Sequence, residues 1–330
     1  MIATRITPLI KVLNIVNNSI KRACEMLANG DLVVMPTETV YGLAADATND
    51  QAVAKIYELK NRPGFNPLIM HVPDVTQAEK WAHFTPAALH LAEAFWDTDH
   101  RSLTLVLNRK KDTSLSHLAT AGLDTVALRV PNHPIALELL KVFGKPLAAP
   151  SANRSNHISP TSVEAVKESL GTRTPFILDG GICAVGLEST IVDMTTPEPV
   201  LLRPGGATKE EIENVLGVSL KLSTSSACIK APGMMKRHYA PNHPLRLNVI
   251  VLLEGEALLG FGPHVPSNAT LNLSETGDLR EAAANLFQML RLLDQSTCKA
   301  IAVMPIPNHG LGLAINDRLK RAASSESINL

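Results

Sequence analysis

The sequence predicts an α/β fold built around one large sheet and followed by a smaller α/β unit. Over residues 1–218, apolar segments of strand length alternate with segments of helical periodicity. Residues 219–244 are rich in Pro, Gly and Ser, a composition typical of a linker. The alternation then resumes over residues 245–330. We therefore expect two domains of unequal size joined by that linker.

The helices of the first domain are predicted from apolar residues that recur at three- and four-residue spacing. They are expected over residues 19–28, 50–59, 85–96, 134–143, 161–170 and 208–216. Gly30 is a suitable stop for the first helix and Pro63 blocks continuation of the second. Ser159 or Thr161 could cap the helix at 161–170.

The strands of the first domain are predicted from short apolar runs between the helices and turns. They are expected over residues 32–35, 103–107, 126–130, 146–149, 176–179, 190–193 and 200–203. Since helices separate many of these runs, all the strands are assigned to one sizeable sheet.

The second domain is predicted as a small parallel sheet because strands and helices again alternate. Its strands are expected over residues 247–253, 257–261, 270–273 and 301–304. Asp278 and Glu281 resemble a capping box that opens a long helix, and a final helix is expected over 314–323. Gly310 to Gly312 is interpreted as a turn into that final helix.

The composition excludes several classes of protein. Among 330 residues, 31 are acidic and 31 basic, so no overall charge attracts the chain to nucleic acid or anionic lipid. The four cysteines form no C-x-x-C pair, which argues against a zinc site and a disulfide framework and favours a reducing cytosol. No secretory signal or membrane-length apolar run is present. A cytosolic location is expected.

Two polar segments suggest an anion site. Lys60 and Arg62 lie between turns limited by proline, and their side chains suit phosphate oxygens. They could also be ordinary cations at a helix C-terminus. Ser151 and Asn153 follow a strand in a loop of small residues whose hydroxyl and N–H groups suit an anion. From the residues alone, these four are the best candidates for a nucleotide pocket.

Three further segments are dense in hydroxyl groups or glycine. They span residues 36–43, 179–190 and 202–206. Each could be a polar turn, and none is specific by itself. His71 lies in an apolar run, where a lone histidine is more often a core residue than a ligand contact. There is no P-loop, H-E-x-x-H or G-x-S-x-G motif, which argues against those enzyme classes.

Taken in order, these segments resemble the YrdC-type threonylcarbamoyl-AMP synthases. The resemblance covers most of residues 20–218 and includes the Lys-x-Arg motif at Lys60 and the Ser-x-Asn motif at Ser151. Residues 231–241 and 310–319 look like the linker and the C-terminal end of the longer, two-domain form. The resemblance implies a YrdC-like twisted mixed sheet with a concave cleft, a linker over it, and a small Rossmann-like C-terminal domain.

The resemblance also implies an activity and a set of site residues. The family forms L-threonylcarbamoyladenylate and pyrophosphate from L-threonine, bicarbonate and ATP, and the product feeds proteins that transfer threonylcarbamoyl to tRNA. By similarity, ATP would be held by Lys60, Arg62, Asn66, Ser151, Asn153, Ser159, Arg203, His238 and Tyr239. Threonine and its carbamate would be held by Thr37, His71, Arg129 and Ser189. Lys60 and Arg62 would be catalytic, as charge stabilisers. Mg²⁺ would arrive with the triphosphate, without a metal site of the protein.

The chain departs from the family pattern in two places. The family usually has a Trp-Pro-Gly-Pro turn before the strand at Leu103, whereas residues 95–102 form a longer and more polar segment. The family also favours Gly where this chain has Asn156. Asn tolerates a left-handed backbone better than most residues, so the turn is expected to survive.

Other functions are compatible with parts of this pattern. A non-catalytic RNA-binding module of the same fold is one alternative, although the neutral charge and the scarcity of aromatic residues disfavour it. Carbamoyl transfer of the hydrogenase-maturation kind would bring Cys-rich zinc motifs, and a dinucleotide oxidoreductase would bring a full glycine fingerprint. Neither feature is present.

Overall fold

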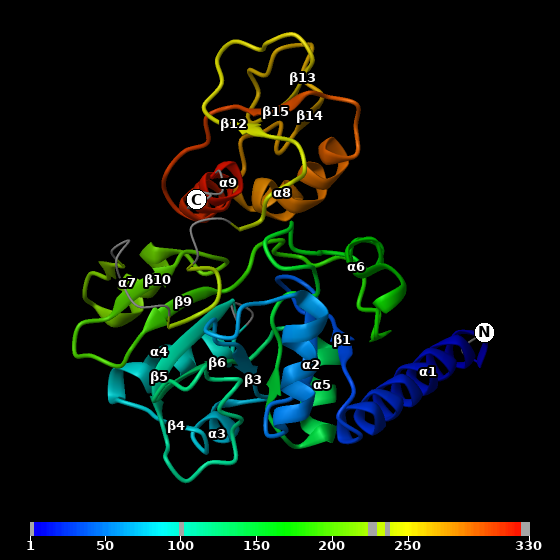
Figure 1. Ribbon diagram of the computed structural model, residues 1–330, viewed down its shortest axis with the longest axis vertical. Helices are drawn as coiled ribbons and strands as arrows, with labels where there is room; N and C mark the ends of the chain where they lie inside the picture. Colours follow the sequence, from blue (N-terminus) through cyan, green and yellow to red (C-terminus); the bar gives the residue numbers. More distant parts are fainter. Residues whose placement is uncertain (1–2, 99–101, 224–229, 235–237, 325–330) are drawn as a thin grey trace.

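The fold comprises two sheets with their covering helices (Figure 1). The computed structural model describes residues 3–98, 102–223, 230–234 and 238–324, with side chains from residue 16 onward. The larger sheet is made by strands before residue 223 and the smaller one by strands after residue 244. The α/β class with two sheets is thus confirmed.

The larger sheet is mixed, as expected. Its strands are β1 (Val33–Met35), β2 (Gly42–Asp46), β3 (Ile69–His71), β4 (Ala82–His83), β5 (Leu103–Arg109), β6 (Thr125–Arg129), β7 (Leu147–Ala148), β8 (Phe176–Ile177), β9 (Thr190–Asp193), β10 (Val200–Arg203) and β11 (Lys221–Leu222). In the described residues their order is β11-β10-β9-β5-β6-β3-β7-β2-β1-β8, and β4 pairs with β5. The central strands β3, β5 and β6 bring distant polar side chains to one side of the sheet.

The helices of the first unit agree in place with the periodicity of the sequence. They are α1 (Ala3–Ala28), α2 (Asp50–Lys60), α3 (Val75–Ala78), α4 (Pro86–Trp96), α5 (Pro134–Phe143), α6 (Val163–Leu170) and α7 (Lys209–Leu216), and a 3₁₀ turn covers Gly171–Arg173. Side-chain caps from Asn49, Thr85 and Thr208 fix the starts of α2, α4 and α7. Helix α1 begins earlier than the predicted residue 19.

Three details of the first unit differ from expectation. Strands β2, β3 and β11 and the short elements α3 and β4 were not predicted, because their short runs show neither a helical nor an alternating pattern. Strand β11 pairs with β10 although its residues were assigned to the linker. Strands β7 and β8 are shorter than predicted. Helix α6 is capped by Ser162, not by Ser159 or Thr161, and the Ser159 hydroxyl bonds elsewhere.

The smaller sheet is parallel throughout, as its sequence order predicted. Its strands β12 (Leu245–Arg246), β13 (Glu256–Gly260), β14 (Leu271–Asn272) and β15 (Ala300–Val303) run in the order β12-β15-β13-β14. Helices α8 (Leu279–Asp294) and α9 (Leu311–Ala323) complete the unit. Figure 1 shows both helices on the side of this unit that faces the larger sheet. Gly310 precedes α9 as a turn, as expected.

The strand predicted over residues 247–253 is wrong. Strand β12 ends at Arg246, and Ile250 is 89% exposed. The chain leaves the sheet because Asn248 adopts a left-handed backbone with φ 55° and the Arg246 side chain bonds to the Val251 carbonyl and to Glu256. An apolar run without alternation did not reveal this turn.

The predicted capping box at α8 forms only in part. Asp278 accepts hydrogen bonds from the N–H groups of Arg280 and Glu281, as an N-cap should. The Glu281 carboxylate accepts instead from the Ser274 hydroxyl, and that hydroxyl oxygen accepts from the Asp278 N–H. Ser274 therefore relays the second bond of the box.

The two units pack tightly against each other. Val40, Ile158 and Leu187 of the first unit share one apolar cluster with Phe287 of α8 and Tyr239 of the linker. At Gly186, where φ is 75°, a Cβ atom would lie 2.5 Å from the Cα of Ala284 in α8. Only glycine permits so close an approach in that conformation. Across the described ranges, no helix combines the length and apolar character needed to cross a membrane.

Candidate active site

A small cavity lies between the large sheet and the linker, and polar or charged side chains make up most of its lining residues. Its volume is about 40 Å³, which is room for about three water molecules. It is lined by Thr37, Val40, Gly42, Arg62, Ile69, His71, Arg129, Ala149, Pro150, Ser151, Glu188, Ser189, Arg203, Pro232, Gly233, His238 and Tyr239. Nine of the thirteen residues predicted from the sequence are among them, and Lys60, Asn66, Asn153 and Ser159 lie outside this lining.

Lys60 ends α2 and lies behind the cavity wall. Its buried ammonium donates to the carbonyl oxygen of Ser151 at 2.6 Å and to the carbonyl and side-chain oxygens of Asn153. Burial and the nearby Arg62 hold the pKa of Lys60 well below its ordinary value. In this conformation Lys60 ties the Ser-x-Asn loop to α2.

Arg62 lines the cavity just beyond the left-handed C-cap at Asn61. Its Nε donates to the Asn66 carbonyl oxygen at 3.2 Å and its Nη2 to the Pro67 carbonyl oxygen at 3.0 Å. Burial lowers the pKa of Arg62 to about 10, against the opposing effects of Tyr57 and Tyr239. The guanidinium is therefore held in place while it remains charged at neutral pH.

The Ser-x-Asn loop is fixed by hydrogen bonds on both sides. Ser151 bridges to Gly42 of β2, and the Asn153 amide donates to the carbonyl oxygens of Arg154 and His157. Asn156 has φ 69°, so the left-handed turn expected at this departure from the family pattern is confirmed. The other departure from the family pattern, the polar segment at residues 95–102, includes residues 99–101, which lie outside the described residues.

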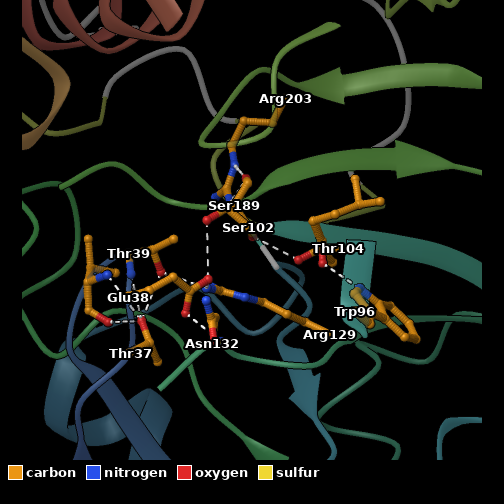
Figure 2. Close-up of polar contacts among 12 residues, drawn as sticks. Thr37, Glu38, Thr39, Trp96, Ser102, Thr104, Arg129, Asn132, Ser189 and Arg203 are labelled. Carbon is orange, nitrogen blue, oxygen red and sulfur yellow. Dashed lines mark hydrogen bonds and ion pairs between the residues drawn. The ribbon is translucent and has the colours of Figure 1, made fainter. Parts of the chain in front are cut away.

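The loop after β1 is organised by Thr37 and Glu38. The Thr37 hydroxyl donates to the Val40 carbonyl oxygen at 2.6 Å and closes the turn. The buried Glu38 carboxylate pairs with Arg129 and accepts from the Asn132 N–H at 2.9 Å (Figure 2). Arg129 reaches the cavity with its charge balanced. Glu38 was not predicted, and its place beside Thr37 was its only signal.

Ser189 and Arg203 form the opposite wall, at the ends of β9 and β10. Arg203 Nη2 donates to the Ser189 carbonyl oxygen at 2.7 Å, and the Ser189 and Thr104 hydroxyls lie 2.7 Å apart (Figure 2). Arg203 Nη1 also donates to the Pro232 carbonyl oxygen in the linker at 3.2 Å. At Gly233, a Cβ atom would lie 2.8 Å from Arg203 Cδ, so the linker crosses directly over this arginine.

His71 is both a buried strand residue and part of the cavity lining. It is 3% exposed in β3. Burial, aided by the nearby Arg129, lowers its pKa to about 3, so the imidazole is neutral at physiological pH. Its Nδ1 has no hydrogen-bond partner among the described residues. A neutral histidine can offer a substrate one donor or one acceptor there.

His238 and Tyr239 bring the linker into the cavity. Their rings are 4.0 Å apart, and Tyr239 stacks on Phe287 of α8 with ring centres 5.6 Å apart. Burial and the surrounding cations, first among them Arg62, hold the pKa of His238 well below its ordinary value. The Tyr239 hydroxyl is buried without a hydrogen-bond partner among the described residues.

Among the described residues, Glu188 is the one acidic residue of the cavity lining, and it was not chosen from the sequence. Its carboxylate accepts from the Ser159 hydroxyl at 2.6 Å and from Arg318 Nε of α9 at 2.8 Å. It is therefore already paired. Arg62 and Arg203 face the same cavity without a bonded carboxylate in the described structure, so the cavity carries excess positive charge.

Comparison with known proteins identifies the family of the chain. The Sua5–YciO–YrdC family model, described as telomere recombination, matches residues 25–205. A second model, described as threonylcarbamoyl-AMP synthase, C-terminal domain, matches residues 207–324. The chain belongs to the Sua5–YciO–YrdC family. The threonylcarbamoyl-AMP synthase of Bacillus subtilis is 40% identical to this family member, over 94% of this chain and 94% of the relative.

Two solved structures of a Sua5 protein share the architecture of both units. Sua5 from P. abyssi, solved with L-threonine, has a TM-score of 0.83 and 39% identity, covering 92% of this chain and 94% of its own. A variant of the P. abyssi protein with a His and the following Tyr both changed to Ala has a TM-score of 0.82 and 36% identity, covering 92% of each chain. In the present sequence, the one His–Tyr dipeptide is His238–Tyr239.

Proposed function

We propose that this chain is a nucleotidyltransferase that forms L-threonylcarbamoyladenylate and pyrophosphate from L-threonine, bicarbonate and ATP. The observation that carries the proposal is the charge of the cavity. Arg62 and Arg203 line it, while Glu188, the one carboxylate among its described lining residues, is paired with Arg318. A buried excess of positive charge suits a polyphosphate, whose charge the two guanidinium groups would offset.

The reaction needs positioning more than a covalent nucleophile. The amine of threonine attacks the carbon of bicarbonate, water leaves, and a carbamate forms. A carbamate oxygen then attacks the α-phosphorus of ATP, the bond from that phosphorus to the β-phosphate oxygen breaks, and pyrophosphate leaves. Fixed cations can stabilise the charge that develops on the leaving group.

The two walls of the cavity suit the two substrates. Thr37, His71, Arg129 and Ser189 are the polar groups that we assign to threonine and its carbamate. Thr37 and Ser189 supply hydroxyls, and His71 supplies a neutral ring that does not repel the charged side chains nearby. Arg62, Ser151 and Arg203 are assigned to the nucleotide. The P. abyssi Sua5 structure solved with L-threonine supports threonine as a substrate.

For Lys60 we propose an indirect role. An ammonium group has three donors, and the Lys60 ammonium contacts three oxygens of Ser151 and Asn153. Lys60 therefore acts on the nucleotide chiefly by shaping the Ser-x-Asn loop. Asn66 and Asn153 would also act indirectly. The carbonyl oxygen of Asn66 accepts from Arg62 and holds it in place, and Asn153 accepts from Lys60.

We propose that Mg²⁺ enters this cavity as an ion carried by the triphosphate. Within the described ranges, no group of three His, Cys, Asp or Glu residues could hold a metal. The Glu188 carboxylate is occupied by Ser159 and Arg318. When bound between phosphate oxygens, Mg²⁺ would neutralise part of their charge. The side chains of the chain would then need to orient the complex but not to ligate the metal.

The linker would act as a lid. A cavity of about 40 Å³ cannot admit ATP, and His238, Tyr239 and Gly233 of the linker form part of its lining. These residues must therefore move for the nucleotide to enter, and their return would exclude water from the intermediate. The alanine variant made in the P. abyssi protein changes the same dipeptide sequence.

The geometry does not favour an RNA-binding module. The cleft cations Lys60, Arg129 and Arg203 are each less than 5% exposed, so they cannot contact the backbone of a folded RNA. We infer that direct nucleic-acid binding is weak or absent. The adenylate would instead pass to the proteins that transfer threonylcarbamoyl to tRNA.

Release of pyrophosphate tests this proposal. Purified protein with Mg²⁺ and ATP should release pyrophosphate only when L-threonine and bicarbonate are both present. A coupled pyrophosphate assay, with each component omitted in turn, measures this dependence. Release that continues without threonine would refute the proposed reaction.

A further inference from the structure

Arg318 of helix α9 reaches from the second unit to the wall of the cavity. Its side chain is fully buried. Nε donates to Glu188 Oε2 at 2.8 Å and Nη1 to Asp317 Oδ2 at 2.7 Å, and the guanidinium lies 4.9 Å from the centre of the Tyr239 ring. The second unit thus places a charge at the site that the first unit forms.

Of the two carboxylates that Arg318 contacts, Glu188 is the one that lines the cavity, and no other carboxylate does so in the part of the chain that the structure describes. Glu188 Oε2 pairs with Arg318, and Glu188 Oε1 accepts from the Ser159 hydroxyl at 2.6 Å. Burial alone would raise the pKa of Glu188, but Arg318 and then Arg203 outweigh it and lower that pKa. Glu188 therefore carries a full negative charge at neutral pH.

An uncompensated charge on Glu188 would oppose the proposed ligand. Arg203 is the second cation in the electrostatic environment of Glu188, after Arg318. Without Arg318, the carboxylate would draw on Arg203 for its counter-charge and would repel a triphosphate across a buried, weakly screened space. Both effects would weaken nucleotide binding.

We propose that Arg318 is a positioning residue that neutralises Glu188 and so keeps Arg203 available for the polyphosphate. The inference rests on the proposed function, because it assumes an anionic nucleotide in the cavity. It also gives the second unit a direct role in the first unit's site: α9 supplies the counter-charge, and Ser159 fixes the other oxygen of the same carboxylate.

A second ion pair between the two units differs from the Arg318–Glu188 pair, and the comparison indicates that Arg318 does more than hold the units together. Arg291 of α8 contacts Glu168 at 3.2 Å, but Glu168 is 44% exposed and Arg291 lies away from the cavity lining. Such exposed pairs contribute little. The contact between the two units is already made by the shared apolar cluster and by the close approach at Gly186. The pairing of the buried Arg318 with Glu188 is therefore not needed to hold the units together and points to a role in the cavity.

Charge rescue tests the proposal on the full-length chain. The variants are Arg318→Met, Glu188→Gln and the double variant, with Arg291→Met as the matched control. Methionine keeps much of the length of arginine without its charge, and glutamine still offers an oxygen to the Ser159 hydroxyl. The dissociation constant of Mg-ATP is measured by calorimetry, and thermal unfolding verifies that each variant is folded.

The expected results follow from the charges. Arg318→Met should weaken Mg-ATP binding at least tenfold, and adding Glu188→Gln should restore it to within about threefold of the wild type. Glu188→Gln alone should tighten binding about threefold or more, because a negative charge leaves the cavity. Arg291→Met should bind as the wild type does.

Three results would overturn the proposal. Unchanged binding by Arg318→Met would show that Glu188 needs no counter-ion. A double variant as weak as Arg318→Met would show that Arg318 acts on the ligand itself or on docking, since its Nη2 has no partner among the described residues. If Arg318→Met does not fold, Glu188→Gln alone decides, and weaker binding contradicts the proposal. Failure of the wild type to bind Mg-ATP would instead count against the proposed function.

Discussion

The Lys60 ammonium lies 2.6 Å from the carbonyl oxygen of Ser151, so the two short motifs that suggested a nucleotide site are bonded directly to each other. Support of the loop and contact with phosphate are two different roles for Lys60, and they lead to different predictions. If Lys60 supports the loop, the loop depends on it even when no ligand is bound.

Replacement of Lys60 by methionine should therefore destabilise the protein without ligand. The oxygens of Ser151 and Asn153 would lose their buried donor, which costs about 1–3 kcal/mol of unfolding free energy. Urea unfolding measures this loss. Lys55→Met, on the exposed face of the same helix, is the control and should change stability by less than about 0.5 kcal/mol. Equal stabilities for the two variants would contradict the supporting role.

Arg62→Ala should reduce the rate of pyrophosphate release by about 10³-fold, because cations that stabilise phosphoryl transfer contribute on that scale. Steady-state kinetics at saturating threonine measures the effect. Arg246→Ala removes an arginine of the second unit that is paired with Glu256 and serves as the control. A near-wild-type rate for Arg62→Ala would show that Arg62 is only a cation at a helix end.

Gly186→Ala should destabilise the contact between the units. The new Cβ would lie 2.5 Å from the Ala284 Cα in α8, so the backbone of one unit must shift. Gly181→Ala is a matched control, since Gly181 also has positive φ, 78°, but a Cβ there meets nothing within 4 Å. Both variants carry the cost of a left-handed alanine, of order 1 kcal/mol. Thermal unfolding should show a clearly larger loss for Gly186→Ala, and equal losses would refute the tight packing.

Stability should fall on acidification through the titration of His71. The ordinary pKa of 6.5 is lowered to about 3 in the folded protein, so the unfolded chain binds a proton that the folded chain refuses. The stabilisation is thus complete above pH 6.5 and decreases as the pH falls toward 3, by up to about 1.4 kcal/mol per pH unit. His71→Gln should reduce the slope of urea-measured stability between pH 6.5 and 5, and the slope that remains would come from other buried histidines such as His238, whose pKa is also lowered. An unchanged slope would show that the folded protein protonates His71 readily.

The sequence predicted most elements of the fold because their signals are local. Helical spacing located α2, α4 and α5, and alternation with strands predicted the parallel sheet of the second unit. The strand expected over 247–253 failed because an apolar run gives no sign that Asn248 turns the chain out of the sheet. Short buried strands such as β3 were not predicted because runs of so few residues show no recognisable periodicity.

The site was predictable where one motif contributes one lining residue, as at Arg62 and Ser151. It was not predictable where function depends on pairing across the chain. Glu188 and Arg318 are separated by 130 residues, and Glu38 and Arg129 by 91. Only the folded geometry shows that Glu38 pairs with Arg129 and Glu188 with Arg318, and that Arg62 and Arg203 face the cavity without a bonded carboxylate in the described structure.

Formation of the adenylate itself is the most direct test of the central claim. The protein would be incubated with Mg²⁺, ATP, L-threonine and ¹³C-bicarbonate, and the products resolved at once by liquid chromatography and mass spectrometry. The account predicts an AMP-containing product that carries one ¹³C atom and one threonine, formed only when all components are present. AMP or pyrophosphate production without incorporation of the labelled carbon into such a product would contradict it.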